Sequence, residues 1–543
     1  MLTLVAHRLR RLIAGRAHEG GQALLFVLIA VALLASIPLV IATTTVDQLP
    51  QTTRNLNYEA AYEAAQAGLN DYLQHLDANE AYGIYCKTCA QGTNGNAAFT
   101  GWVQASTSPA ESYTYAPTDT NGLIALKVSG KAGTGNTAVV RTFSYNVKPA
   151  TSLNDVYWSN YETRDPAIGA LWPGVPAGYQ DCDVHYDQLD YHYGDAYAPQ
   201  HGPPESACEV SFQTGDVLNG PIFSNDTFRM CGTPTFDSAV QSGNIWNTAS
   251  NAGPAYAGIL VPSNGCGGNN PAFNGPAPMK VSNQTPRSAS DDLTPARNFG
   301  CFITGGTAPS SLTPTNVTMT LSVSGSTTKV TWSGSGGTIV DNAGTNANSC
   351  TSPITVSSLS AGLIFVNGNV TISGQMTGGL DVVTCSTTVD TGACNSTTTS
   401  NIIISGALTY PTANKVLASG QPTSDSHDAL GLIAANSVEV ATTSTVEIDA
   451  AILALKDSFY VNNWFGGSSY GTLNVFGSIA QNFRGPVGQS GGIGYVKNYN
   501  YDTSLQTLFP PYFIPPDGAT WSPSAYEECA GGSAHSVQNT PSC

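Results

Sequence analysis

Charged side chains are scarce in this chain: Asp, Glu, Lys and Arg together make up 10% of its 543 residues. Helical bundles need Glu and Lys on their exposed faces, so this scarcity argues against a mainly helical protein. Glycine, proline and small polar residues are abundant instead, which favours turn-rich β structure. Single hydrophobic cores stop growing near about 250 to 300 residues, so the length predicts at least two domains.

Basic residues are few as well, with 20 Lys and Arg against 37 Asp and Glu. Four of the arginines and one glutamate precede residue 22, which leaves 16 basic and 36 acidic residues in the remainder, a net charge of about −20. Such an acidic surface repels phosphate backbones. We therefore expect no nucleic-acid partner.

Motifs of common enzyme classes are missing: the sequence has neither a nucleotide-binding P-loop nor an H-E-x-x-H zinc motif. We accordingly expect a protein that is not an enzyme.

Cysteines number twelve and lie mostly in Gly-, Ser- and Thr-rich sequence without neighbouring histidines. An even set in this context predicts disulfides in an oxidising compartment rather than metal ligation. Short spacing makes two local pairs plausible, Cys385 with Cys394 and Cys529 with Cys543.

An uncharged, mostly apolar run extends from Gln22 to Val46. At about 1.5 Å per helical residue it is long enough to cross a hydrocarbon core of about 30 Å. Arginines precede the run and Asp47 is the first charge after it, which places the N-terminus in the cytoplasm. The sequence predicts a single-pass membrane protein with an extracytoplasmic body, at the cell surface or in a pilus.

Helical periodicity continues beyond this run. Small and apolar residues, among them Ala61, Ala65, Gly68 and Leu69, recur mostly at steps of three and four residues. The spacing predicts one long helix over 22–76, bent at Pro38, where a backbone donor is lost.

The N-terminal region resembles that of PilX-type minor pilins of type IV filaments. The resemblance is carried by the basic leader, by the segment 19–25 (EGGQALL) and by the segment 58–69 (YEAAYEAAQAGL). It implies that a prepilin peptidase removes the leader between Gly21 and Gln22, with Gly20 to Gly21 as the alternative bond. It also implies that the helix packs among other pilin subunits in the core of a filament.

Phe26 departs from the pattern of major pilins, which carry a glutamate at this position to neutralise the N-terminal ammonium of a neighbouring subunit. A buried unpaired charge is costly, so a subunit without this carboxylate suits a filament tip, where no such neighbour exists. The absence fits a plain membrane anchor equally well.

Changes in composition along the sequence divide the chain into six segments. We expect a leader at 1–21, the helix at 22–76, a small β headpiece at 77–150, a β-rich region with insertions at 151–360, a solenoid at 361–490 and an irregular tail at 491–543. Short apolar strands near Asn and Gly residues in 363–482 indicate a right-handed parallel β-helix, with a β-sandwich as the competing architecture. The predicted fold class is thus mainly β with one long N-terminal helix, a pilin-like α+β headpiece and a β-helix-like solenoid.

The richest polar cluster begins near residue 181, where Asp, His and Tyr alternate. Carboxylates at alternate positions of a strand point to one side and suit calcium, which prefers several oxygen ligands. The candidate ligands are Asp181, Asp183, His185 and Asp187. The glycine and the glutamate of an EF-hand calcium loop are missing, so a solvated acidic loop without a metal is the alternative. We expect no cofactor other than this possible calcium ion.

Three functions follow from these features. The first is a minor-pilin-like subunit that displays a large β body for interaction with a surface glycan or a cell ligand. The second is a membrane-anchored β-helical carbohydrate-active enzyme using solenoid carboxylates, namely Asp381, Glu439, Glu447, Asp449 and Asp457. The third is a cell-envelope scaffold without any filament.

Overall fold

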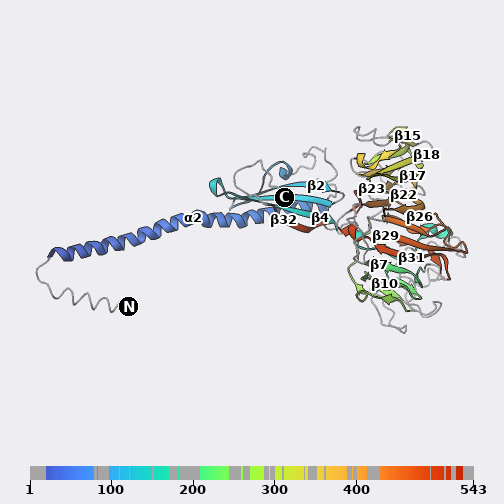
Figure 1. Cartoon of the computed structure of the whole chain (residues 1–543), viewed down its shortest axis with the longest axis horizontal. Helices are drawn as coiled ribbons and strands as arrows, with labels where there is room; N and C mark the ends of the chain where they lie inside the picture. The colour runs from blue at the N-terminus through green and yellow to red at the C-terminus, as the bar shows by residue number, and fades with distance from the viewer. Residues whose placement is uncertain are drawn as a thin grey trace, which may run out of the picture.

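The structure is a computed structural model in which a long helix, a small sheet that we call the head and a large β body follow one another along the longest axis (Figure 1). The residues that it describes are 20–78, 82, 97–108, 110–120, 123–149, 152–171, 182, 208, 210–243, 258–260, 270–286, 293, 300–308, 311–334, 337–339, 351–359, 362–387, 394, 400–411, 428–489, 491–506, 509–514 and 521–529.

The helix α2 (Gly20–Ala78) is 59 residues long, or roughly 90 Å at 1.5 Å per residue. The helix continues through Pro38 without interruption. Within the residues described, no helix meets the length and hydropathy that crossing a membrane requires, in contrast to the span predicted for 22–46.

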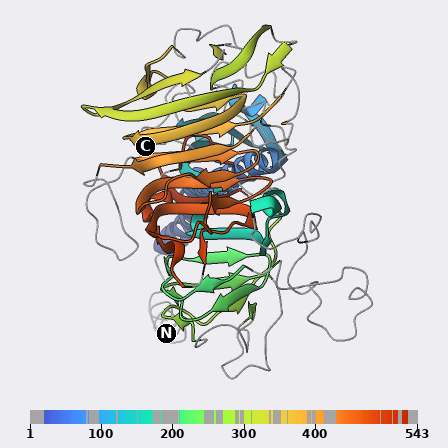
Figure 2. The ribbon, with the colours of Figure 1, turned by 90° about the vertical axis from the view of Figure 1, so that its right-hand side faces the viewer.

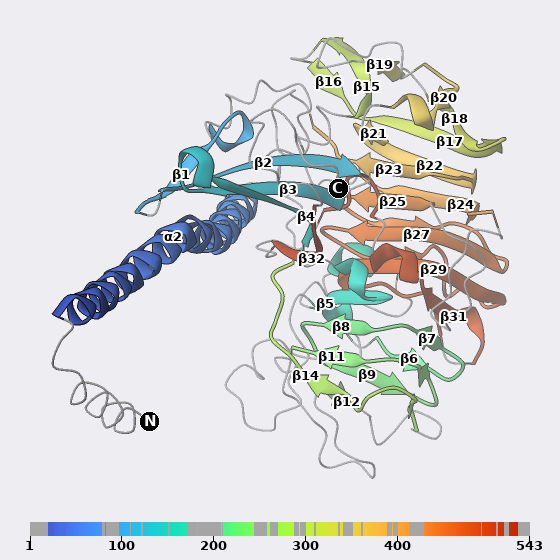
Figure 3. The same cartoon turned by 60° about the vertical axis from the view of Figure 1, so that its left-hand side comes forward.

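The head is a five-stranded antiparallel sheet that packs on the second half of α2, as Figure 3 shows. Its strands lie in the order β1 (Val103–Thr107), β2 (Ala110–Thr120), β3 (Leu123–Ala132), β4 (Val139–Pro149) and β32 (Trp521–Glu528). The first four are consecutive in the chain, but β32 comes from the segment predicted to be an irregular tail. The body is therefore inserted between the last two strands of the head.

The body consists mainly of one sheet of 24 strands, several of them stacked as parallel rungs (Figure 2). One row of parallel pairs has the order β15 (Cys301–Ala308), β21 (Leu363–Val366), β23 (Gly379–Thr384), β25 (Ala429–Ala434), β27 (Val446–Ala454), β29 (Ser469–Arg484), β5 (Tyr157–Arg164), β8 (Ile222–Ser224), β11 (Val240–Ser242) and β14 (Met279–Lys280).

Two further rows branch from the first. One contains β17 (Thr315–Ser324), β22 (Gly368–Gln375), β24 (Ile402–Thr409), β26 (Val438–Val440) and β28 (Phe459–Val461). The other continues from β27 and β29 through β31 (Ile493–Tyr501), β7 (Val217–Asn219), β10 (Thr235–Phe236) and β13 (Ala272–Phe273).

The remaining strands are short or lie at the margins. In the large sheet they are β16 (Ser311–Thr313), β18 (Thr327–Gly334), β19 (Gly337–Ile339), β20 (Ile354–Thr355) and β30 (Gly488–Gln489). A separate parallel sheet of three strands contains β6 (Phe212–Gln213), β9 (Phe228–Cys231) and β12 (Ile259–Leu260).

The chain does not build the rows in sequence order. Strands from β6 to β14, drawn in green in Figure 2, occupy one end next to β5, drawn in teal, and the chain then reaches the opposite end at β15, drawn in yellow. From there it returns rung by rung until β29 pairs with β5. The body therefore has a seam between β29 and β5, where an early and a late segment of the chain meet.

The predicted right-handed parallel β-helix following the headpiece is wrong for the body. Antiparallel pairs such as β17 with β18 occur beside the parallel ones, and no closed solenoid is found in the part of the chain that the structure describes. Strands also extend before residue 361 and after residue 490. Apolar runs reveal where strands form, whereas long-range packing decides how they pair.

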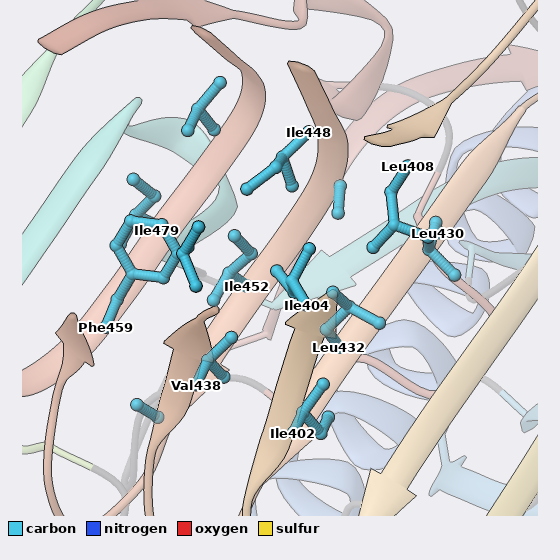
Figure 4. Packing of buried hydrophobic residues seen from close by; sticks show 14 of the residues in the cluster. Ile402, Ile404, Leu408, Leu430, Leu432, Val438, Ile448, Ile452, Phe459 and Ile479 are labelled. Carbon is cyan, nitrogen blue, oxygen red and sulfur yellow. The ribbon is translucent and has the colours of Figure 1, made fainter. Parts of the chain in front are cut away.

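Two hydrophobic cores explain why some strands are apolar throughout. In β21 and β25 every residue is buried, because alternate side chains enter a main core and a second core on the other face of the row. Figure 4 shows part of the main core, where Ile404, Leu432 and Ile452 from three strands converge. In β17, by contrast, buried and exposed residues alternate, as expected for a one-sided strand.

Disulfides link Cys385 to Cys394, as the short spacing predicts, and Cys182 to Cys208. Cys529 is also disulfide-bonded, whereas its proposed partner Cys543 lies outside the described residues.

Candidate functional site

Near its start, over 25–36, α2 presents an apolar surface that the described part of the chain does not cover. Every side chain described between Leu25 and Ser36 is exposed, and the large apolar ones are exposed by 47% to 68%. Phe26, at the position where major pilins carry glutamate, is among the most exposed. Leaving so many apolar side chains in water is unfavourable, so this segment is the strongest candidate for a contact with another molecule.

The second half of α2 is covered by the head. Asn57 marks the transition, because its side-chain amide donates to the carbonyl oxygen of Thr137 at 2.8 Å. From there on, the residues that the spacing places on one face are buried against the sheet, namely Ala61, Ala65, Leu69, Tyr72 and Leu76. One helix thus has an uncovered segment at 25–36 and a segment from Asn57 onward that is fixed to the head.

Close approach of helix and sheet depends on two glycines. A Cβ added to Gly130 of β3 would overlap the carbonyl oxygen of Ala61 and the backbone nitrogen of Ala65. Gly68, on the helix, lies against the ring of Tyr113, where an added Cβ would come within 2.9 Å of it. The small residues of α2 therefore set the distance between helix and head, which their spacing alone does not reveal.

Aromatic side chains fill the far end of this contact. The rings of Tyr72, Tyr82, Phe99 and Tyr115 pack edge-on or tilted, with centroids 4.9 to 6.4 Å apart. The hydroxyls of Tyr82 and Tyr115 are 2.6 Å apart, and burial raises the pKa of Tyr115 well above its ordinary value. This cluster packs the end of α2 against the head.

Arg141 of β4 joins the helix to the C-terminal strand. Its guanidinium donates two hydrogen bonds to the Glu528 carboxylate, at 2.7 and 2.8 Å, and lies 4.0 Å from the ring centroid of Tyr58. The hydrogen bonds from Arg141 lower the pKa of Glu528. Arg141 thus contacts α2 and β32 at the same time, and neither contact is predictable from the sequence.

The predicted cleavage residues Gly21 and Gln22 lie within α2, close to its first residue Gly20. The predicted calcium ligands Asp181, Asp183, His185 and Asp187 lie outside the described residues. Among the residues that are described, no group of three or more His, Cys, Asp and Glu side chains is arranged to hold a metal ion.

Three of the carboxylates considered for catalysis are buried. Asp381 and Asp449 have no exposed surface, and Asp457 is 6% exposed. Asp449 accepts a hydrogen bond from the backbone N–H of Tyr410 at 2.7 Å, which is a structural contact.

Asp381 holds a segment that we call the strap, Phe509–Ile514. Its carboxylate accepts a hydrogen bond from the backbone N–H of Tyr512, and burial raises its pKa to about 8. Beside it, Pro511 packs against Gly362 and Gly379, where added Cβ atoms would come within 2.9 and 3.1 Å of the proline ring. Asp381 therefore fixes the chain that leads from the body to β32.

Two buried ion pairs that sequence reasoning missed lie where early and late segments of the chain meet, one at the pairing of β29 with β5 and the other at the pairing of β31 with β7. Arg484 donates to Glu162 at 2.6 Å, and Lys497 donates to Asp216 at 2.7 Å. In both pairs the acid comes from the early segment and the base from the late one. Glu162 also accepts from the hydroxyl of Tyr157, which helps to satisfy the buried carboxylate.

Comparison with known proteins finds one weak structural similarity and no match in sequence. No family model matches this chain, and no curated protein matches it. Among solved structures the chain is weakly similar to the competence-associated pilin ComZ from Thermus thermophilus, with 10% sequence identity and a TM-score of 0.27. The match covers 87% of this chain and 97% of that chain. At this TM-score the likeness is too weak to establish a shared fold.

Proposed function

We propose that this chain is a minor-pilin-like structural subunit of a type IV filament or of its initiation complex. In this role, the exposed segment of α2 between Leu25 and Ser36 inserts between the helices of neighbouring subunits. The contrast along the helix carries the proposal: the segment from Asn57 onward packs on the head of its own chain, while the segment 25–36 leaves large apolar side chains in water. Burying a Leu or Phe side chain contributes about 1.5 to 3 kcal/mol, so several of them suffice for a stable contact.

The N-terminal sequence supports the same role. Its resemblance to PilX-type minor pilins implies removal of the leader by a prepilin peptidase between Gly21 and Gln22. Phe26 offers no carboxylate to a neighbour's ammonium, which supports a position at the filament tip. Disulfides support an oxidising compartment outside the cytoplasm.

The body lies on the side of the head opposite to the free end of α2 (Figure 1). A subunit held by its helix would therefore display the body away from the filament core. We propose that the body serves contact with a surface glycan or a cell ligand, in a role that is structural and not catalytic.

The proposed function can be tested by shearing filaments from the cell surface and analysing this chain in the sheared fraction. N-terminal sequencing should find a mature chain beginning at Gln22, and replacing Phe26 and Leu33 by serine should lower the amount of the chain in the sheared fraction at least tenfold. Met279→Ser is the matched control, because Met279 is also exposed but lies in the body. An uncut chain that never appears in sheared filaments would contradict the proposal.

A further inference from the structure

Lys497 is unusual among the lysines of this protein because its side chain is buried. Among the lysine side chains that the structure describes, it is the only one in this state, and its partner Asp216 is buried as well. The ammonium Nζ donates to Oδ2 of Asp216 at 2.7 Å. A buried ion pair adds little net stability compared with apolar side chains of similar volume, so stability alone does not explain a lysine at this place.

The pairing of β31 with β7 holds the two groups together. Lys497 and Asp216 directly precede Asn498 and Val217, which face each other in this pairing. The backbone N–H of Lys497 donates to Oδ1 of Asp216 at 3.1 Å, and the backbone N–H of Gln213 donates to Oδ2 at 2.9 Å. Both carboxyl oxygens are therefore fixed by the backbone, with the lysine nitrogen held against the same carboxyl group.

The surroundings favour a neutral amine on Lys497. Burial lowers the pKa of Lys497 despite the opposing charge of Asp216, and the positive charge of Arg484 lowers this pKa further. The buried ring of Phe212 lies against both cations, with its centroid 5.7 Å from Nζ of Lys497 and 3.6 Å from Cζ of Arg484. A neutral lysine amine is a nucleophile, whereas the arginine guanidinium stays protonated.

We infer that the side chains of Lys497 and Asp216 condense into an intramolecular amide bond. The ammonium first gives one proton to Oδ2 of the carboxylate, which leaves a neutral amine beside a neutral carboxylic acid. Nζ then bonds to the carboxyl carbon, the bond from this carbon to Oδ2 breaks, and Oδ2 leaves as water with a second proton from Nζ. An ammonium and a carboxylate thus become one amide and one water, and no further reactant is needed.

The fold supplies what this condensation requires. Reacting groups held in place behave as if present at about 10⁵ to 10⁸ M, which offsets the competition from water that prevents free amines and acids from condensing. Negative charge develops on Oδ1 while the carbon is attacked, and the backbone N–H of Lys497 already points at this oxygen. The reaction therefore depends on the folded body and not on a second protein.

The bond would lock the junction of early and late segments in the body. It joins positions 281 residues apart, at the place where β31 meets β7. Opening this junction would then require breaking a covalent bond rather than an ion pair. The inference is independent of the proposed function, since it concerns the body alone.

Mass spectrometry of the full chain, purified from cells and reduced, tests the inference. The mass should be lower than that of the mature sequence by one water molecule. Trypsin does not cleave after an acylated lysine, so the digest should contain the peptide 165–229 joined to the peptide 485–543, and fragmentation should place the link between Asp216 and Lys497. Separate peptides 165–229 and 485–497, without the joined species, would overturn the inference.

Two variants complete the test. Lys497→Arg keeps the positive charge but cannot attack, so it should lose the joined peptide and regain the mass of the full sequence. Lys280→Arg, at an exposed lysine of the body, is the matched control and should keep the joined peptide. A joined peptide that persists in Lys497→Arg would also overturn the inference. Should Lys497→Arg fail to fold, the digest of the unchanged chain decides by itself.

Discussion

Asparagine in place of Asp381 should make the body less sensitive to pH. Asp381 is fully buried in β23 and accepts a hydrogen bond from the backbone N–H of Tyr512 in the strap. Burial raises its pKa from the ordinary value of 3.8 to about 8. At neutral pH the folded protein therefore holds this carboxyl protonated, whereas the unfolded chain has it ionised.

The sign and size of the effect follow from this difference in pKa. A carboxyl with a raised pKa contributes its full stability below pH 3.8, and that stability is lost as the pH rises toward 8. Each pH unit in this window lowers the free energy of unfolding by about 1.4 kcal/mol, which amounts to about 4 kcal/mol between about pH 4 and pH 7. The Asp381→Asn variant keeps an acceptor for the N–H of Tyr512 and cannot ionise. It should therefore match the unchanged protein in acid and exceed its stability at neutral pH.

Urea unfolding followed by tryptophan fluorescence, at about pH 4.5 and about pH 7.5, measures this difference. Other buried carboxyls also make the stability depend on pH, such as Asp155, whose pKa burial raises to about 7. Their contributions to the free energy of unfolding are the same in both proteins and therefore cancel in the comparison. Asp237→Asn, at an exposed aspartate of the body, is the control and should have the same effect at both pH values. An Asp381→Asn effect that is equal at the two pH values would refute the reasoning.

Three further substitutions test the contacts that hold the fold. Gly130→Ala should loosen the helix from the head and lower the stability by about 1 to 3 kcal/mol or more, seen as earlier thermal unfolding, because a Cβ there overlaps the helix backbone. Arg484→Met should cost about 3 to 5 kcal/mol in urea unfolding, because it leaves Glu162 charged and buried, and adding Glu162→Met should recover most of the loss. Equal losses in the single and double variants would contradict this account. Cys385→Ser, which opens the loop closed by Cys394, should cost about 2 to 3 kcal/mol, and a reducing agent should remove the difference from the unchanged protein.

Local patterns in the sequence predicted the positions of many elements. The apolar runs that begin at Leu363 and Leu430 correspond to β21 and β25, whose residues are buried on both faces of the row. Ala61, Ala65 and Leu69, which recur at helical spacing, are buried where α2 meets the head. These features depend on neighbouring residues, so a short window of sequence is enough to reveal them.

Pairing between distant segments was not predictable. Trp521 of β32 pairs with Pro149 of β4, although the described residues of β32 are largely exposed and the strand contains Pro523, so its sequence resembles an irregular tail. The ion pair of Arg484 with Glu162 joins positions 322 residues apart. Nothing near either residue in the sequence indicates a partner, because the two charges meet only through the fold and attract each other strongly only once they are removed from water.

The sequence by itself determined that this chain has an apolar helical segment, a β-rich body with little charge, and cysteines suited to an oxidising compartment. Composition and short-range periodicity carry these properties, since they reflect hydration and local backbone preference. Only the tertiary structure decided that the body is inserted into the head, that its early and late strands meet at a charged seam, and that the last strand lies beside the helix. Each of these depends on contacts between segments hundreds of residues apart, which the packing of the whole chain selects.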